Sequence, residues 1–92
     1  MKLKDLLAGI CVLEATADME LNIENVFYDS RKVIPGSLFV AITGFASDGN
    51  RFIPMAIEKG AVAVVTAKKP ESAVPYILVE SDRMALALIG CN

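Results

Sequence analysis

The chain has 92 residues and a net charge of −2, and 54% of its residues are hydrophobic against 22% that are charged. This balance is that of one small folded domain and excludes a disordered polypeptide. The weak acidity gives no electrostatic basis for binding nucleic acid or an anionic membrane. Histidine is absent, which removes the commonest general base and metal ligand, and the sequence predicts neither catalytic residues nor a metal site.

Cys11 and Cys91 stand near opposite ends of the chain without a C-x-x-C pattern, so we expect no zinc site. A disulfide between them is one interpretation. The other interpretation, which we favour, is that both thiols are reduced and lie in the core of a cytoplasmic protein. Residues 1–15 begin with basic and apolar residues but lack a clean cleavage site, and no apolar run approaches the ~20 residues of a membrane span. We therefore expect a first helix and a cytoplasmic location.

The first half of the chain predicts short elements separated by turns. Leucines at helical spacing predict a helix over residues 2–8 that ends at Gly9. An extended segment at 10–13 and a short strand around 21–23 follow. NVFYDS (25–30) predicts a strand that runs into a loop. A Pro35-Gly36 turn precedes SLFVAI (37–42), a continuous apolar run typical of a strand that is buried on both faces.

The second half predicts a strand–helix–strand unit and a final helix. A helix is expected over residues 50–61, with Phe52, Met55 and Ala56 on its apolar side, Pro54 in its first turn and its end at Lys59-Gly60. AVAVVTA (61–67) and YILVE (76–80) predict strands, joined by a solvated loop. Ser81-Asp82 can cap a last helix over 83–92, with one apolar stripe at Met84, Leu88 and Cys91 and another at Leu86 and Ile89. Because these stripes are so complete, we expect the natural chain to continue. The fold class is α/β, with a small mixed, partly parallel sheet flanked by helices.

The loop between the apolar run and the middle helix raises a functional question. Gly44 and Gly49 have the spacing of a phosphate-binding loop, G-x-x-x-x-G-K-[ST]. The next residues are Asn50 and Arg51, so the lysine and the hydroxyl are missing, and Asp48 adds negative charge where the anion would lie. From the residues alone, a nucleotide-binding loop and a plain turn at Asp48-Gly49 both remain open, and the plain turn is favoured.

A longer ordered pattern includes this loop. The motif D-S-R-x-V-x-P-G-x-L-F-V-A-x-x-G-x-x-x-D-G-x-x-F-I, followed by A-x-x-x-G-A, runs without a gap from Asp29 to Ala61. It resembles the N-terminal domain of the Mur ligases of peptidoglycan synthesis. The opening MKLKDLL and the ending VPYILVESDRMALALI are most similar to the branch that extends UDP-N-acetylmuramoyl-L-alanyl-D-glutamate (MurE). Asn50 stands where the family often has histidine, which we interpret as a tolerated polar exchange.

The resemblance implies that residues 1–92 form an N-terminal domain that holds the UDP moiety of the substrate. By position in the motif, Ser30 contacts UDP, Tyr28 maps to a neighbouring contact, and Phe45, Ala46 and Ser47 map to the contacts that follow the loop glycine. A serine hydroxyl can bond a uracil edge or a phosphate oxygen, and two aromatic rings can cover the uracil. Tyr28 is equally interpretable as a core residue. For Asp29 and Arg31, which flank Ser30, we favour a structural pair over ligand contact.

The resemblance also implies a larger parent protein. Its central domain would use ATP and magnesium to activate the D-glutamate carboxylate, and its C-terminal domain would choose the third amino acid. This chain would carry no cofactor, and its partners would be the UDP-muramoyl peptide and the missing domains. Two alternatives remain: the equivalent domain of the ligase that adds D-alanyl-D-alanine (MurF), and a non-enzymatic module for protein contact.

Overall fold

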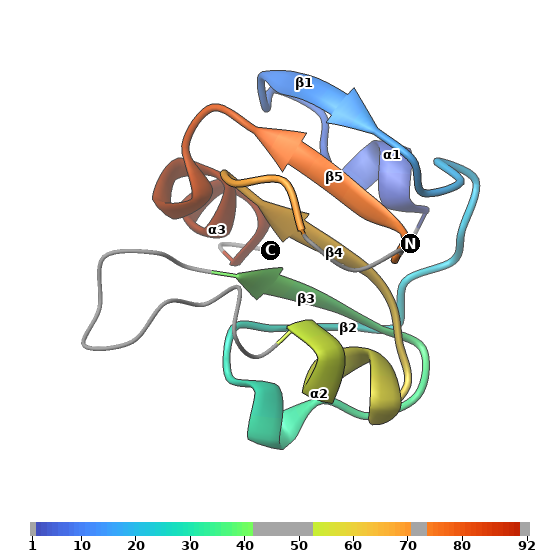
Figure 1. Cartoon of the computed structure of the whole chain (residues 1–92). Helices are drawn as coiled ribbons and strands as arrows, with labels where there is room; N and C mark the ends of the chain where they lie inside the picture. The colour runs from blue at the N-terminus through green and yellow to red at the C-terminus, as the bar shows by residue number, and fades with distance from the viewer. Residues whose placement is uncertain (1, 42–52, 71–73, 91–92) are drawn as a thin grey trace.

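The centre of the fold is a five-stranded sheet in the order β1-β5-β4-β3-β2 (Figure 1). The computed structural model describes residues 2–41, 53–70 and 74–90. The strands β2 to β5 are parallel to their neighbours, whereas β1 is antiparallel to β5. The predicted mixed, partly parallel α/β sheet is therefore confirmed. In chain order the strands are β1 (Val12–Ala15), β2 (Asn25–Phe27), β3 (Ser37–Ala41), β4 (Ala61–Thr66) and β5 (Tyr76–Val79).

Helices cover both faces of this sheet. The helices α1 (Leu3–Leu6) and α3 (Asp82–Gly90) pack on one face, and α2 (Ile53–Glu58) packs on the other, next to the short 3-10 helix η1 (Ser30–Lys32). Successive residues of β3 divide between the two layers: Leu38 lies in the cluster with α1 and α3, and Phe39 lies in the cluster with α2. All of β3 is buried, as its continuous apolar run predicts.

Two predicted elements differ in the structure. The prediction of a strand around residues 21–23 is wrong. The backbone there pairs with the start of α1, where the Leu3 N–H donates to the Leu21 carbonyl and an isolated bridge joins Lys2 to Asn22. The first strand begins later than expected, at Val12. The Ile10 N–H still donates to the Leu7 carbonyl, so the turn after α1 extends past Gly9.

The helices bury only part of the apolar sides predicted for them. In α2 the buried residues are Ile53 and Ala56, whereas Met55 is 42% exposed and Phe52 lies outside the described residues. Among the α3 residues whose burial is described, Ala85 and Ile89 are buried, so one predicted stripe is confirmed at Ile89, and the other is wrong for Met84, which is 65% exposed. Ala85 is fully buried in the cluster between α3 and the sheet. The predicted cap at Ser81 is confirmed, since its Oγ accepts from the Met84 N–H at 3.2 Å.

The amino ends of the parallel strands are held together by the Pro35-Gly36 turn and Gly60. The Glu24 N–H donates to the Gly36 carbonyl and the Gly36 N–H donates to the Gly60 carbonyl, each at 3.1 Å. Gly60, which ends α2, has a φ of +110°, and a Cβ placed on it would lie 2.6 Å from the Pro35 Cα. Only glycine fits here, because both the backbone conformation and the contact exclude a side chain.

Replacing Gly60 with alanine is expected to lower the free energy of unfolding by about 2–4 kcal/mol, since the methyl group collides with backbone and φ is held positive. The matched control is Gly9→Ala, where φ is +85° but nothing lies within 4 Å of the new Cβ. That change should cost only about 1 kcal/mol, from strain alone. Urea unfolding of both variants measures the difference, and equal losses would contradict the role of the Pro35 contact.

Candidate functional site

The polar and aromatic residues of interest gather where the parallel strands end. Tyr28 follows β2, Lys68 follows β4, and Glu80 and Ser81 follow β5. The arrowheads of β3, β4 and β5 point to the same side of the molecule in Figure 1. We call this side the carboxyl edge. Open α/β sheets bind their ligands in the space outside the carboxyl ends of the strands, so this edge is the candidate site.

The turn after β2 is built around an ion pair. Asp29 caps η1: its Oδ1 accepts from the Arg31 backbone N–H at 3.0 Å and from the Arg31 Nε at 3.1 Å, and its Oδ2 accepts from Nη2 at 2.9 Å. Lys59, which directly follows α2, then donates from its Nζ to the Arg31 carbonyl at 3.1 Å. The structural pair predicted for Asp29 and Arg31 is confirmed, and these bonds fix the backbone on both sides of Ser30.

The same contacts set the charge of this turn. The Arg31 guanidinium beside Asp29 lowers the pKa of that carboxyl to about 2, and the carboxylate in turn raises the pKa of Arg31. Both groups are therefore ionised at neutral pH. Because they neutralise one another within two positions of the chain, the pair gives the turn a fixed shape, and Lys32 supplies its remaining positive charge.

Tyr28 stands immediately before this turn with 63% of its surface exposed. Its interpretation as a core residue is therefore wrong. The reason is that β2 is an edge strand ending at Phe27, which packs against the cluster under α2, and the sheet does not extend to cover the next residue. An exposed aromatic ring beside a rigid turn is suited to hold a flat apolar group.

The other predicted contact residues, Phe45, Ala46 and Ser47, lie outside the described residues, so their role stays a prediction. Cys91 lies outside them as well. Cys11 is a free, exposed thiol, so its expected place in the core is wrong.

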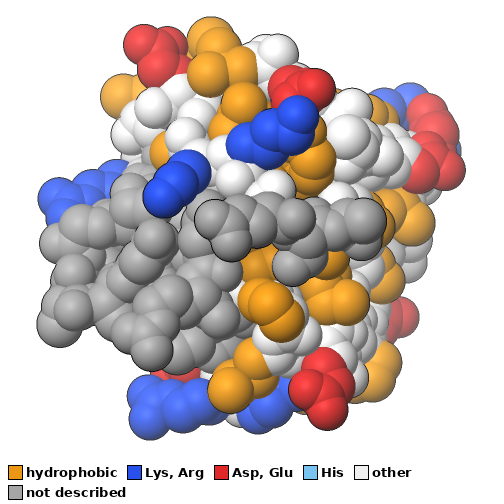
Figure 2. Space-filling model, viewed as in Figure 1, with side chains coloured by type: hydrophobic (Ala, Val, Ile, Leu, Met, Phe, Trp, Pro, Cys, Tyr) orange, Lys and Arg blue, Asp and Glu red, His pale blue; other side chains and the backbone are white. Residues whose placement is uncertain are grey.

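Across residues 2–41, 53–70 and 74–90, no three His, Cys, Asp or Glu side chains come together as a metal site. No helix in that same part is long and apolar enough to cross a membrane. On the face in Figure 2, acidic and basic side chains are interspersed around hydrophobic surface.

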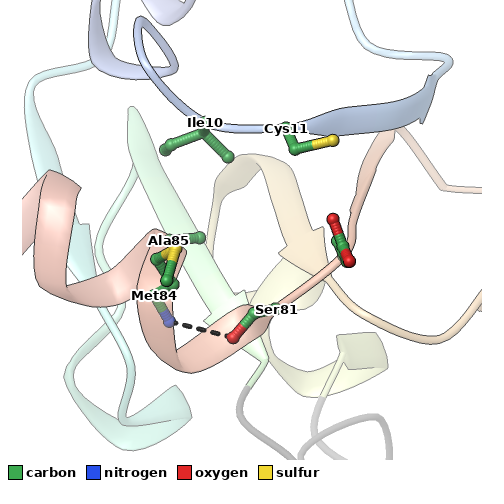
Figure 3. Close-up of a pocket in the computed structure, with 6 residues that line it drawn as sticks. Ile10, Cys11, Ser81, Met84 and Ala85 are labelled. Atoms are coloured by element: carbon green, nitrogen blue, oxygen red, sulfur yellow. Dashed lines mark hydrogen bonds between the residues drawn. The ribbon is translucent and has the colours of Figure 1, made fainter.

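A pocket that the sequence did not predict lies between the start of β1 and the end of β5 (Figure 3). It has a volume of about 330 Å³ and is lined by Ile10, Cys11, Glu80, Ser81, Met84 and Ala85. Its walls come from segments far apart in the chain, so no local pattern indicates it. Met84, which the sequence placed in an apolar stripe and the structure leaves 65% exposed, forms part of its wall.

Comparison with known proteins identifies the family. Residues 22–88 match the family described as "Mur ligase family, catalytic domain". A UDP-N-acetylmuramoyl-L-alanyl-D-glutamate–2,6-diaminopimelate ligase of Alkaliphilus metalliredigens is 46% identical over 98% of this chain. One with the same name from Chlorobium phaeobacteroides is 44% identical over 96%. The chain belongs to the Mur ligase family. It spans about a fifth of the length of these relatives, 19% of the first and 18% of the second.

Solved Mur ligase structures share the fold. A MurF structure from Acinetobacter baumannii superposes with a TM-score of 0.80 over 97% of this chain and 20% of its own length, at 19% identity, which is evidence for the fold alone. MurF of Thermotoga maritima in complex with ADP gives a TM-score of 0.65 at 33% identity, over 76% of this chain and 16% of its own. The names of the sequence relatives favour the MurE branch over the MurF branch.

Removing the Arg31 guanidinium with Arg31→Gln is expected to raise the pKa of Asp29 from about 2 toward the ordinary value of a carboxyl group. The folded pKa lies below the unfolded one, so the stability that the pair contributes is present above about pH 4 and is lost as the pH falls toward the folded pKa. In the variant this pH dependence should largely disappear. A carbon NMR titration of the Asp29 carboxyl measures the shift.

Lys32→Gln is the matched control, because the Lys32 side chain acts on the Asp29 carboxyl through charge alone, and the bond from the Lys32 N–H to the Asp29 carbonyl is kept in the variant. It should move the pKa of Asp29 much less. Equal shifts in the two variants would mean that nearby positive charge, and not the hydrogen-bonded pair with Arg31, lowers the pKa of Asp29.

Proposed function

We propose that this chain is the N-terminal domain of a MurE-type ligase and that it holds the UDP end of UDP-N-acetylmuramoyl-L-alanyl-D-glutamate. The observation that supports this most is the position of the D-S-R turn. Asp29 and Arg31 make it rigid, it stands at the carboxyl edge of a parallel sheet, and an exposed Tyr28 precedes it. The names of the sequence relatives support the choice of nucleotide-sugar substrate.

Each predicted site residue has a distinct role in this proposal. The Tyr28 ring covers one face of the uracil, and the Ser30 hydroxyl bonds a uracil edge or a phosphate oxygen. Phe45 adds apolar surface, and the backbone N–H groups of Ala46 and Ser47 bond the ribose or the diphosphate. The sequence places Phe45 four positions after Ala41, the last residue of β3, which ends at the same edge as β2.

The chemistry of the parent protein is assigned to its other domains. The parent would be a cytoplasmic ligase that uses ATP and magnesium to form an amide bond at the D-glutamate carboxylate. In this chain the Gly44–Gly49 spacing is followed by Asn50 and Arg51 and not by the lysine and hydroxyl of a phosphate loop, so we assign no step of that chemistry to it. The relatives' names suggest 2,6-diaminopimelate as the added amino acid.

One specific observation supports the interaction-module alternative. Met84 is 65% exposed and Leu88 is 43% exposed one turn apart on α3, a surface that could bind another protein. A stable dimer that buries this side of α3, together with no affinity for uridine nucleotides, would favour that alternative.

An amide chemical-shift titration of the 92-residue chain with UDP, then ATP, then the UDP-muramoyl dipeptide tests the proposal. A domain that holds one end of its ligand should bind it with a Kd of about 10 μM to 1 mM. We expect UDP to shift the resonances of Tyr28–Arg31 and residues 44–47, and ATP to leave them in place. No response to UDP or to the full substrate at millimolar concentration would refute UDP recognition by this chain.

Replacing Tyr28 with alanine is expected to weaken UDP binding about tenfold, because stacking of a base on an aromatic ring contributes about 1–3 kcal/mol. The matched control is Leu13→Ala, since Leu13 is similarly exposed, at 59%, but lies on β1 at the far end of the sheet. It should leave UDP affinity unchanged. Calorimetric titration with UDP measures the affinity of both variants. An unaltered affinity in Tyr28→Ala would show that the Tyr28 ring does not contact UDP.

A further inference from the structure

The turn after β2 gathers positive charge in a chain that is acidic overall. Arg31 and Lys32 follow one another in η1, and the Lys59 Nζ lies 3.1 Å from the Arg31 carbonyl. Among the described residues, Asp29 alone pairs with these three cations. The turn is therefore left with an excess of positive charge, whereas the whole chain has a net charge of −2. Basic side chains gather at the lower edge of the face in Figure 2, where Figure 1 places η1 and α2.

The backbone of Lys32 is held on both sides while its side chain stands at the surface. Its N–H donates to the Asp29 carbonyl at 3.0 Å, and the next residue, Val33, is 5% exposed in the cluster under α2. Lys32 itself is exposed. A lysine on a fixed backbone has less freedom to lose when it binds an anion, so this position suits a charged contact.

Lys32 also lies within the length of a nucleotide from Tyr28. The bond between the Lys32 N–H and the Asp29 carbonyl closes a turn, which keeps the two Cα atoms within ~7 Å of each other. Tyr28 directly precedes Asp29, so the Cα atoms of Tyr28 and Lys32 are at most ~11 Å apart. A nucleoside diphosphate carries its base and its phosphates on opposite sides of the ribose, and one molecule can therefore reach both side chains.

The other two cations of the turn are tied to the turn itself. Two bonds join the Arg31 guanidinium to the Asp29 carboxylate, and the Lys59 ammonium bonds the Arg31 carbonyl. Glu58, the acidic residue beside Lys59, forms no ion pair with these cations in the part of the chain that the structure describes. The Lys32 ammonium is thus the cation that an anion can approach without breaking a bond that shapes the turn.

We propose that Lys32 binds the diphosphate of the nucleotide whose base lies at Tyr28. This inference rests on the proposed function and adds to it a residue that distinguishes a nucleoside diphosphate from the free nucleoside. The excess positive charge of the turn attracts the anion, and the Lys32 ammonium donates a charge-assisted hydrogen bond to a phosphate oxygen. Tyr28 recognises the base by stacking, and Lys32 recognises the phosphates by charge.

The test compares UDP with uridine on the 92-residue chain and its variants, by amide chemical-shift titration. The unmodified chain should bind UDP more tightly than uridine. Lys32→Gln should weaken UDP binding roughly three- to tenfold and leave uridine binding unchanged. The turn should keep its shape in this variant, because the bond to the Asp29 carbonyl comes from the backbone. Lys32→Arg should keep the preference for UDP.

Lys69→Gln is the matched control. It removes the same charge from an exposed lysine that follows β4, two strands away from β2 in the sheet. The turn there should also keep its shape, because the Thr66 hydroxyl donates to the Lys68 carbonyl at 2.8 Å and accepts from the Lys68 N–H at 3.1 Å. This variant should change neither affinity. Equal weakening of UDP binding in Lys69→Gln and Lys32→Gln would overturn the inference, since the overall charge of the chain would then attract the nucleotide.

The remaining outcomes separate this inference from the proposed function. Equal binding of UDP and uridine by the unmodified chain would overturn the inference and leave recognition of the base intact. An undiminished preference for UDP in Lys32→Gln would also overturn it, since the phosphates would then be held elsewhere. Failure to bind either compound would overturn the inference together with the proposed function.

Discussion

Pro35 and Gly60 approach so closely that no side chain fits between them, and this contact fixes how the central strands meet. Two hydrogen bonds run from it through Gly36, one to Gly60 and one to Glu24, so the segments that enter β2, β3 and β4 are joined at their amino ends. Once that end is fixed, the parallel register determines where each strand finishes. The carboxyl edge can then carry turns of very different shape without disturbing the sheet.

The candidate site depends on this division between a fixed end and a variable end. The turn after β2 is closed by the Asp29–Arg31 pair, and the turn after β4 is closed by the Thr66 hydroxyl. Each turn is stabilised by its own local bonds, and the sheet supplies only the spacing between them. Lys59 is an exception, because its bond to the Arg31 carbonyl ties the first turn to α2. Rigid local turns on a common frame are what positions groups for recognition of an extended ligand.

Much of this architecture could be predicted from the sequence, for identifiable reasons. The runs at 37–42 and 61–67 are apolar at every position, which leaves a doubly covered strand as the natural interpretation. The helix faces could not be predicted as well, because α3 carries apolar residues all round and the choice of Ala85 over Met84 depends on how closely the helix approaches the sheet. The exposure of Tyr28 follows from β2 lying at the sheet edge, which the aromatic run could not indicate. The bonds between Thr66 and Lys68 come from a turn geometry without a local sequence pattern.

The two outermost strands have a consequence for the behaviour of the chain in a crowded solution. The strand β2 has three residues, and β1 has four with a shift of register between Val12 and Glu14. Their outer backbone groups thus form ladders too short and too irregular for a strand of another copy to extend. In a chain with more than half of its residues hydrophobic, long regular edge strands would allow copies to pair edge to edge into fibres. The short edge strands of this sheet work against such pairing.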